Sequence, residues 1–260
     1  MDFSKEVREK SSLAHIRQAS PLVHCITNYV VSNVTANGLL AIGASPVMAD
    51  ELEEVQEMVS IAGGLLLNIG TLNARTTDSM LAAGKQANRL GIPVVLDPVG
   101  VGATSYRQRF VQRLLSEINF DLLRCNRGEL AAIAGVAWQS RGVDSGEGSQ
   151  DIKEIAKQVA KQYRCLVAVT GDWDYVTDGE REAMITGGDI RMTAVTGMGC
   201  LLSAICAAAL SLPGDRFKHL QGVLQDYKLA AEIAGAQPKI GSFQVEIMNA
   251  LEQLSAGERL

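Results

Sequence analysis

The sequence predicts an α/β fold in which a mostly parallel central sheet is flanked by helices. Three observations predict it: short apolar runs without polar alternation, amphipathic stretches between them, and a glycine-rich turn that opens into a helix of small residues. A chain of 260 residues that is 47% hydrophobic and 20% charged is long enough to bury a full core. We expect a single domain over residues 1–260.

The expected strands are short and lack polar alternation, as strands covered on both faces do. They fall at residues 22–26, 64–69, 93–97, 121–125 and 166–170. Helical patterns fill the intervals at residues 31–42, 76–90, 105–118 and 152–163, and Gly91 and Pro93 end the second of these helices. Because strands and helices alternate, the strands should run parallel.

The pattern changes after residue 170. Residues 175–177, 182–186 and 191–193 are typical of short antiparallel strands, joined by Asp-Gly and Gly-Gly turns. Three largely helical segments then close the chain. The Gly- and Ser-rich stretch at residues 141–151 is expected to be a solvated surface loop.

The composition excludes several classes of partner. A formal net charge of -5 leaves no basic excess for nucleic acid or an anionic membrane. The N-terminus is charged, and no apolar run approaches the roughly 20 residues of a membrane helix. The five cysteines form no CxxC pair, which favours reduced thiols over a disulfide frame or a zinc site. We therefore expect a soluble, cytoplasmic protein whose partner is a small molecule.

The most informative motif is T-G-M-G-C at residues 196–200, which opens into an apolar helix. Gly197 and Gly199 allow a tight turn whose N–H groups point inward, and the first N–H groups of the helix have no partner within it. Such a turn binds phosphate, and the thiol of Cys200 would lie beside it. No GxxxxGK[ST] loop is present, so this turn is the expected phosphate site. A crossover turn without a ligand is the alternative.

Two carboxylates follow expected strands, where ligands of open α/β sheets bind. Asp97 ends the strand at 93–97, and Glu129 comes shortly after the strand at 121–125. Oxygen ligands of this kind suit Mg²⁺. Each has a structural alternative, because Asp97 could cap a turn or helix and Glu129 could be an acid in a helix's first turn.

Arg124 and Thr170 also lie at strand ends. The planar guanidinium of Arg124 suits phosphate oxygens, and Thr170 could contact a nucleotide through its hydroxyl. An ion pair is an equally open reading of Arg124, and a simple turn remains open for Thr170.

Together these segments resemble the hydroxyethylthiazole kinase family, thiamine-salvage enzymes of the ribokinase-like superfamily. The resemblance is most specific at residues 20–50 and is reinforced by LLLNIGT ending at residue 71, by VVLDPVGVGAT at 94–104, by GVDSGEG at 142–148 and by VTGMGCLLS at 195–203. It implies a ribokinase-like three-layer sandwich and a homotrimer with active sites near subunit interfaces. It also implies Mg²⁺-dependent transfer of the ATP γ-phosphate to 4-methyl-5-(2-hydroxyethyl)thiazole.

The resemblance also implies roles for individual residues. It implies that Asn28, Met48 and Gly197 contact the substrate. It implies that Arg124 and Thr170 contact the nucleotide, with Gly199 in the phosphate-binding turn. It also implies that Asp97 and Glu129 hold Mg²⁺, mainly through water. A thioether such as that of Met48 packs well against a thiazole ring, although a core methionine is the reading without the resemblance.

Cys200 departs from the pattern of related sugar and pyrimidine kinases, which end this turn in an aspartate that can accept the substrate's hydroxyl proton. A helix N-terminus lowers the pKa of a thiol, so a Cys200 thiolate would act as the base, while a nearby triphosphate would oppose its ionisation. Because a loose phosphoryl-transfer transition state needs little from a base, we expect Cys200 to be helpful rather than indispensable.

Two other functions stay open from the sequence. One is a kinase for a related small alcohol such as hydroxymethylpyrimidine, which the segment at residues 20–50 argues against. The other is a weakly catalytic protein that binds thiazole or nucleotide, which Cys200 supports. Asp97, Glu129 and Arg124 argue for a working enzyme.

Overall fold

A computed structural model describes residues 11–136, 147–237 and 239–257. The α-helices are α1 (Ser12–Ala19), α2 (Ser32–Ala41), α3 (Val55–Ser60), α4 (Ala74–Leu90), α5 (Ser105–Glu117), α6 (Arg127–Ala134), α7 (Glu147–Tyr163), α8 (Met198–Leu210), α9 (Arg216–Ala234) and α10 (Ile240–Ala256). The strands are β1 (Leu22–Ile26), β2 (Ser45–Val47), β3 (Gly64–Asn68), β4 (Val94–Asp97), β5 (Leu122–Asn126), β6 (Leu166–Thr170), β7 (Asp174–Thr177) and β8 (Glu182–Ile185).

All eight of these strands form one sheet, in the order β2-β1-β3-β4-β5-β6-β7-β8. The pairs from β2 to β6 are parallel, and β7 and β8 add antiparallel strands at one edge. The expected mostly parallel sheet is therefore confirmed. Parallel pairing brings the carboxyl ends of β1, β3, β4, β5 and β6 to one edge, where the candidate site lies.

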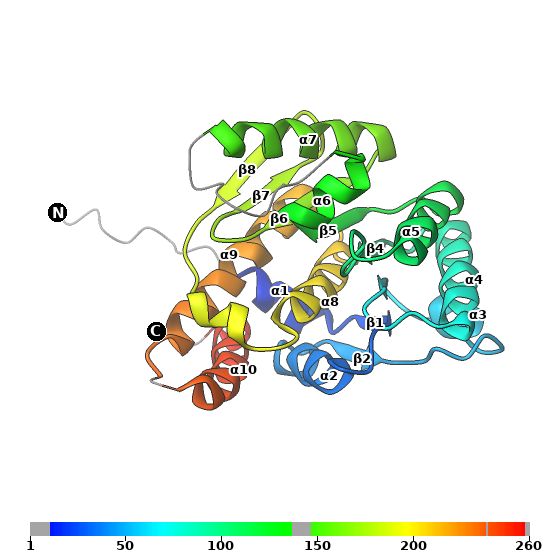
Figure 1. Cartoon of the computed structure of the whole chain (residues 1–260). Helices are drawn as coiled ribbons and strands as arrows, with labels where there is room; N and C mark the ends of the chain where they lie inside the picture. Colours follow the sequence, from blue (N-terminus) through cyan, green and yellow to red (C-terminus); the bar gives the residue numbers. More distant parts are fainter. Residues whose placement is uncertain (1–10, 137–146, 238, 258–260) are drawn as a thin grey trace.

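Helices cover both faces of the sheet (Figure 1). Alternate strand residues belong to two separate buried clusters: Leu66 and Val95 pack with α1, α2, α8, α9 and α10, whereas Leu65 and Leu67 pack with α3 to α7. The strands lack polar alternation because both of their faces are buried. This arrangement confirms the three-layer sandwich.

The structure corrects the sequence analysis in one expected strand. Residues 191–193 belong to a 3-10 helix, η1 (Ile190–Ala194), instead of an antiparallel strand. Asp189 causes the difference, because its side chain accepts a hydrogen bond from the Arg191 backbone N–H at 2.9 Å and so starts a helical turn.

The expected loop at residues 141–151 is also only partly accounted for. Residues 147–151 form the start of α7, and residues 141–146 lie outside the described residues, as does most of the GVDSGEG motif. In the part of the chain that is described, no helix has the length and apolar character needed to cross a membrane.

Candidate active site

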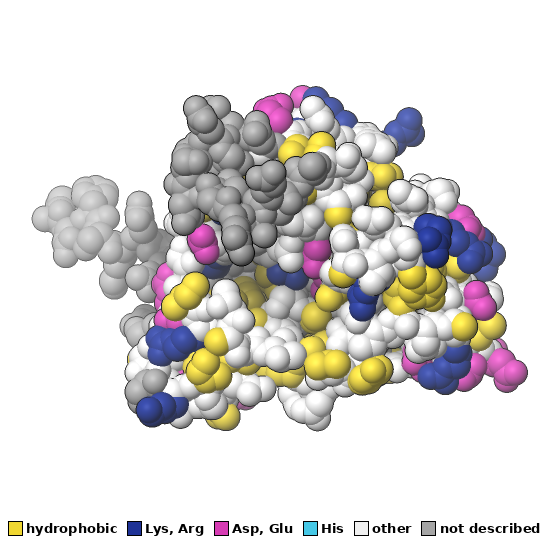
Figure 2. Space-filling view, in the orientation of Figure 1, with side chains coloured by type: hydrophobic (Ala, Val, Ile, Leu, Met, Phe, Trp, Pro, Cys, Tyr) yellow, Lys and Arg dark blue, Asp and Glu magenta, His cyan; other side chains and the backbone are white. Residues whose placement is uncertain are grey.

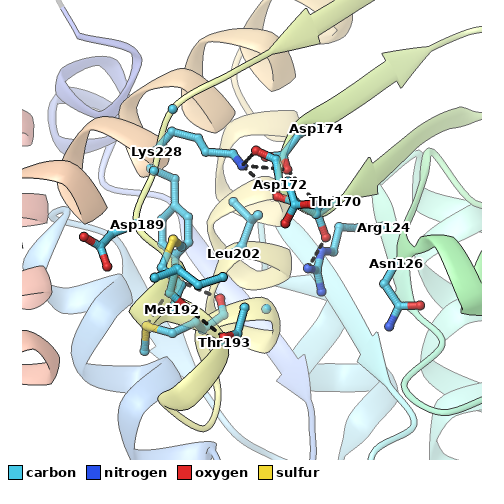
Figure 3. Close-up of a pocket in the computed structure, with 17 residues that line it drawn as sticks. Arg124, Asn126, Thr170, Asp172, Asp174, Asp189, Met192, Thr193, Leu202 and Lys228 are labelled. Carbon is cyan, nitrogen blue, oxygen red and sulfur yellow. Dashed lines mark hydrogen bonds and ion pairs between the residues drawn. The ribbon is translucent and has the colours of Figure 1, made fainter. Parts of the chain in front are cut away.

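A pocket of about 470 Å³ lies at the carboxyl ends of β5 and β6, beside the start of α8. It opens near the middle of the face shown in Figure 2, where Lys or Arg and Asp or Glu side chains are visible around the hollow. Its polar wall comes from β5, β6 and the turn after β6, and its other walls come from η1, α8 and α9. Residues that line it and matter below are Arg124, Asn126, Thr170, Gly171, Asp174, Gly199 and Lys228 (Figure 3).

The two glycines of the T-G-M-G-C motif have different roles. Gly197 is the N-cap of α8 with φ +95°, and a Cβ there would lie 2.8 Å from Val34 Cγ1. The turn predicted at Gly197 is therefore confirmed. Gly199 lies inside the first turn of α8 and has no positive φ, so it is not a turn glycine. It is needed for another reason, since a Cβ at Gly199 would lie 2.6 Å from Arg124 Nη1.

Arg124 lines the pocket and forms the ion pair that was its alternative interpretation. Its guanidinium lines the pocket and donates a hydrogen bond to Thr170 Oγ1 (Figure 3). Its Nη1 also lies 3.9 Å from Asp97 Oδ1, which forms the ion pair named as the alternative. Its side chain is only 12% exposed. A buried cation that faces a pocket is well placed to bind an anionic ligand.

Asp97 is completely buried at the end of β4 and caps neither a helix nor a turn. Its Oδ2 accepts hydrogen bonds from Asn68 Nδ2 and Ser203 Oγ, both at 2.8 Å. Its Oδ1 is buried and has no hydrogen-bond donor among the described residues. Burial raises the pKa of Asp97 to about 6, although the positive charge of Arg124 opposes the rise.

Glu129 uses both of its carboxylate oxygens on backbone groups. Its Oε2 accepts from the Asn126 N–H at 2.9 Å, in a capping box at the start of α6. Its Oε1 accepts from the Gly100 N–H, also at 2.9 Å, and so holds the turn that follows β4. The first-turn acid named as the alternative is therefore present. The carboxylate also connects two strand-end loops beside Asp97.

The oxygen donors around Asp97 suit a cation that takes few of its ligands from the protein. Within the described residues, no three His, Cys, Asp or Glu side chains gather closely enough to enclose a metal ion. The buried Oδ1 of Asp97, which accepts no hydrogen bond from the described residues, is a hard oxygen donor of the kind that Mg²⁺ binds together with water and phosphate oxygens.

Asn28 and Cys200 lie next to each other, close to Asp97. Asn28 Nδ2 donates to Asn68 Oδ1 at 2.9 Å and lies 3.6 Å from Cys200 Sγ. Burial, followed by the negative charge of Asp97, raises the pKa of the Cys200 thiol, and the neighbouring amides oppose the rise. The expectation of a lowered pKa was wrong, because burial outweighs the favourable field at the start of α8.

The structure does not bring every predicted residue to the pocket. Arg124, Thr170 and Gly199 line it. The other predicted site residues do not line it, namely Asn28, Met48, Asp97, Glu129, Gly197 and Cys200. Met48 is half-buried against the hydrophobic cluster that contains α8, which is what its core alternative describes.

Sequence reasoning missed four polar residues that organise the site. Asn68 and Ser203 hold Asp97, as described above. Lys228 of α9 is 7% exposed and donates to the Gly171 carbonyl at 2.9 Å, while its Nζ lies 3.2 Å from Asp174 Oδ1. These two contacts hold the turn after β6 against the pocket (Figure 3). The available signals were an asparagine at the end of an apolar strand and a serine within the apolar α8, whereas Lys228 in α9 and Asp174 at the start of β7 carried no such signal.

Comparisons with known proteins identify the family. A model of the hydroxyethylthiazole kinase family matches residues 13–257. The chain is 58% identical to a hydroxyethylthiazole kinase of Lysinibacillus sphaericus over 241 residues, covering 92% of this chain and 94% of the relative. It is 48% identical to the corresponding kinase of Haemophilus influenzae, covering 94% and 93% of the two chains.

Two solved structures place the fold. A hydroxyethylthiazole kinase protein from Pyrococcus horikoshii is 40% identical, with a TM-score of 0.85 over 93% of this chain and 91% of that chain. A ribokinase-like superfamily protein from Enterococcus faecalis is 10% identical, with a TM-score of 0.65 over 95% of this chain and 90% of that chain, and supports the fold alone.

Proposed function

The chain belongs to the hydroxyethylthiazole kinase family, and we propose that it carries out the family's reaction at the pocket beside the start of α8. The reaction transfers the γ-phosphate of ATP to the hydroxyl of 4-methyl-5-(2-hydroxyethyl)thiazole, a step of thiamine salvage. The observation that carries the proposal is the buried guanidinium of Arg124, which faces the pocket between Thr170 and the first turn of α8.

The pocket wall supports binding of the ATP phosphates. Arg124 supplies a fixed cation, and the first N–H groups of α8 supply donors that have no partner within the helix. Because Gly199 carries no side chain, the guanidinium lies directly against this turn. Lys228 neutralises Asp174 and holds the turn at Gly171, so the wall is positioned before the nucleotide arrives.

Asp97 is the residue that we assign to Mg²⁺, with Glu129 organising the loops around it. The ion, when bound, neutralises negative charge on the transferring phosphate. The chain's own contribution is to hold the Asp97 carboxylate by two donors on Oδ2, which leaves Oδ1 as the ligand atom. Glu129 fixes the Gly100 turn beside it.

Replacing Glu129 by glutamine is expected to raise the Mg²⁺ concentration needed for half-maximal activity by about tenfold. The amide places an NH₂ group, which only donates, where one of the two carboxylate oxygens stood. Either the Gly100 or the Asn126 N–H group then loses its acceptor, and the loops beside Asp97 loosen. Activity is measured across a Mg²⁺ titration, and binding of the thiazole alcohol without metal serves as the control. Coincident Mg²⁺ curves for mutant and parent would limit Glu129 to helix capping.

Cys200 acts mainly by position in this proposal. Its raised pKa keeps the thiol protonated near neutral pH, so proton removal from the substrate hydroxyl relies little on it. Asn28 lies 3.6 Å from the sulfur, which supports a substrate hydroxyl site next to both side chains. A loose transition state tolerates a weak base.

Two substitutions test whether Cys200 takes part in removing the proton of the substrate hydroxyl. Cys200→Asp should retain or raise kcat, because a carboxylate accepts a proton more readily than a neutral thiol. Cys200→Ala should lower kcat by about tenfold and leave measurable turnover. Steady-state kcat at saturating ATP and thiazole is compared for the three proteins. Equal values would remove any role for Cys200 in proton transfer.

We also propose that the chain forms a homotrimer and works in the cytoplasm. Tyr29 and Val30 are 78% and 61% exposed directly after Asn28, and a pair of apolar side chains beside a substrate residue suits a subunit interface. Light scattering should give the mass of three chains.

The proposal of a cytoplasmic location is supported by the cysteines. All five cysteines are free, which suits a reducing compartment.

A comparison of two alcohols tests the substrate assignment. ADP release is followed with the thiazole alcohol and with hydroxymethylpyrimidine, at the same concentrations of enzyme, ATP and Mg²⁺. We expect kcat/KM to favour the thiazole alcohol by at least about 100-fold, since a pocket shaped for one ring and its polar groups rejects the other. A preference for the pyrimidine would support the kinase for a related alcohol instead.

A further inference from the structure

Asn28 and Asn68 form a buried amide relay between Cys200 and Asp97. Asn68 is 1% exposed and Asn28 is 4% exposed. The relay runs from Asp97 Oδ2 to Asn68 Nδ2 at 2.8 Å, and then from Asn68 Oδ1 to Asn28 Nδ2 at 2.9 Å. It therefore connects the carboxylate assigned to Mg²⁺ with an expected substrate contact.

The orientation of both amides is determined by their partners. The Gly70 backbone N–H, which can only donate, lies 2.9 Å from Asn68 Oδ1 and so fixes that atom as the oxygen. Asn68 must then turn its NH₂ group to Asp97, and Asn28 must turn its NH₂ group to Asn68. The second N–H of Asn28 is left for Cys200 Sγ, at 3.6 Å, and the Asn28 carbonyl oxygen is left as an acceptor.

Close packing against Gly70 adds a steric constraint. A Cβ at Gly70 would lie 2.6 Å from Asn28 Nδ2 and 2.8 Å from Asn28 Cγ. The side chain of Asn28 therefore rests directly on the backbone of the loop after β3. The same loop supplies the N–H that orients Asn68.

We propose that Asn68 is a positioning residue for the thiazole alcohol, and that it acts by fixing the amide orientation of Asn28. Asn68 touches no substrate in this account. It sets which atom of Asn28 is the donor to Cys200 and which is the acceptor offered to the substrate. The inference rests on the proposed function, because it takes Asn28 as the substrate contact.

The test measures the dissociation constant of the thiazole alcohol by calorimetry, with the full chain and without ATP or Mg²⁺. Asn68→Leu keeps a similar volume but removes both bonds that Asn68 makes in the relay. It should weaken thiazole binding by about tenfold, the loss expected for one misdirected hydrogen bond. Ser203→Ala is the matched control. It also removes one donor from Asp97 Oδ2, but Ser203 makes no hydrogen bond with Asn28, so the dissociation constant should stay within about twofold.

A double-mutant cycle separates positioning from general stabilisation. In an Asn28→Ala background, Asn68→Leu should weaken binding by less than about twofold further, because the residue through which it acts is already gone. Gly70→Ala provides a second variant if Asn68→Leu does not fold. It should displace the Asn28 amide and also weaken binding by about tenfold, without removing a donor from Asp97.

Unchanged thiazole binding in folded Asn68→Leu, or additive losses in the cycle, would overturn the positioning role. Failure of the unmodified protein to bind the thiazole alcohol would instead overturn the proposed function, and the relay's role with it. The two failures are distinguishable, because only the second is seen before any substitution is made.

Discussion

A Gly199→Val protein is expected to fold and to lose at least about 100-fold in kcat/KM, the scale of losing a fixed donor to the transferring phosphate. A Cβ at this position would lie 2.6 Å from Arg124 Nη1 and 3.0 Å from Nη2, so the guanidinium must move away from the start of α8. Because Arg124 is a buried cation that faces the pocket, its displacement should remove the proposed phosphate contact.

The control for Gly199→Val is Gly241→Val. Gly241 also lies in the first turn of a helix, α10, but a Cβ there meets nothing within 4 Å. The two substitutions carry the same cost in helix propensity and differ in what the new side chain meets. Thermal unfolding and kcat/KM are measured for both. Near-normal activity in folded Gly199→Val would show that the first turn of α8 does not hold phosphate.

Arg124→Met is expected to lower kcat/KM for ATP by about 1000-fold, within the range that a transition-state arginine supplies. The methionine fills much of the space but has no charge for the phosphates. It also leaves Asp97 buried without its cation, 3.9 Å away in the parent, so the pKa of Asp97 should rise further. The free energy of unfolding should fall as well.

Binding measurements separate the two effects of Arg124→Met. The dissociation constant of ATP should rise strongly, whereas binding of the thiazole alcohol should change little, because no hydrogen bond joins Asn28 to Arg124. Arg113→Met is the matched control, since its ion pair with Glu117 is on the surface and its loss should be nearly silent. Unchanged ATP affinity in folded Arg124→Met would contradict the phosphate assignment.

Much of the fold follows from the sequence because burial on both faces leaves a continuous apolar signature in each central strand. The elements that lack this apolar signature are the ones that the sequence did not predict correctly. β2 (Ser45–Val47) is three residues long and contains Pro46, so it carries almost no pattern. The segment at 190–194 was misread because one capping side chain, Asp189, decided between a strand and a helical turn.

The candidate site was predictable where the chemistry is local and unpredictable where it depends on contacts. The positions of Asp97 and Thr170 follow from strand ends. Arg124, which was expected at a strand end, lies in the middle of β5. The partnership of Asn68 with Asn28 joins residues 40 positions apart, and that of Ser203 with Asp97 joins residues 106 apart. The raised pKa of Cys200 also depends on burial by such distant residues, which no local motif records.

The most direct test of the account is to identify the phosphorylated product. The protein is incubated with Mg²⁺, the thiazole alcohol and ATP labelled in its γ-phosphate, and the reaction is resolved by chromatography and mass spectrometry. The account predicts that the label moves to the hydroxyl of the thiazole alcohol, one phosphate ester for each ADP formed, and that Arg124→Met abolishes the transfer. Release of the label only as inorganic phosphate, or transfer that survives Arg124→Met unchanged, would contradict it.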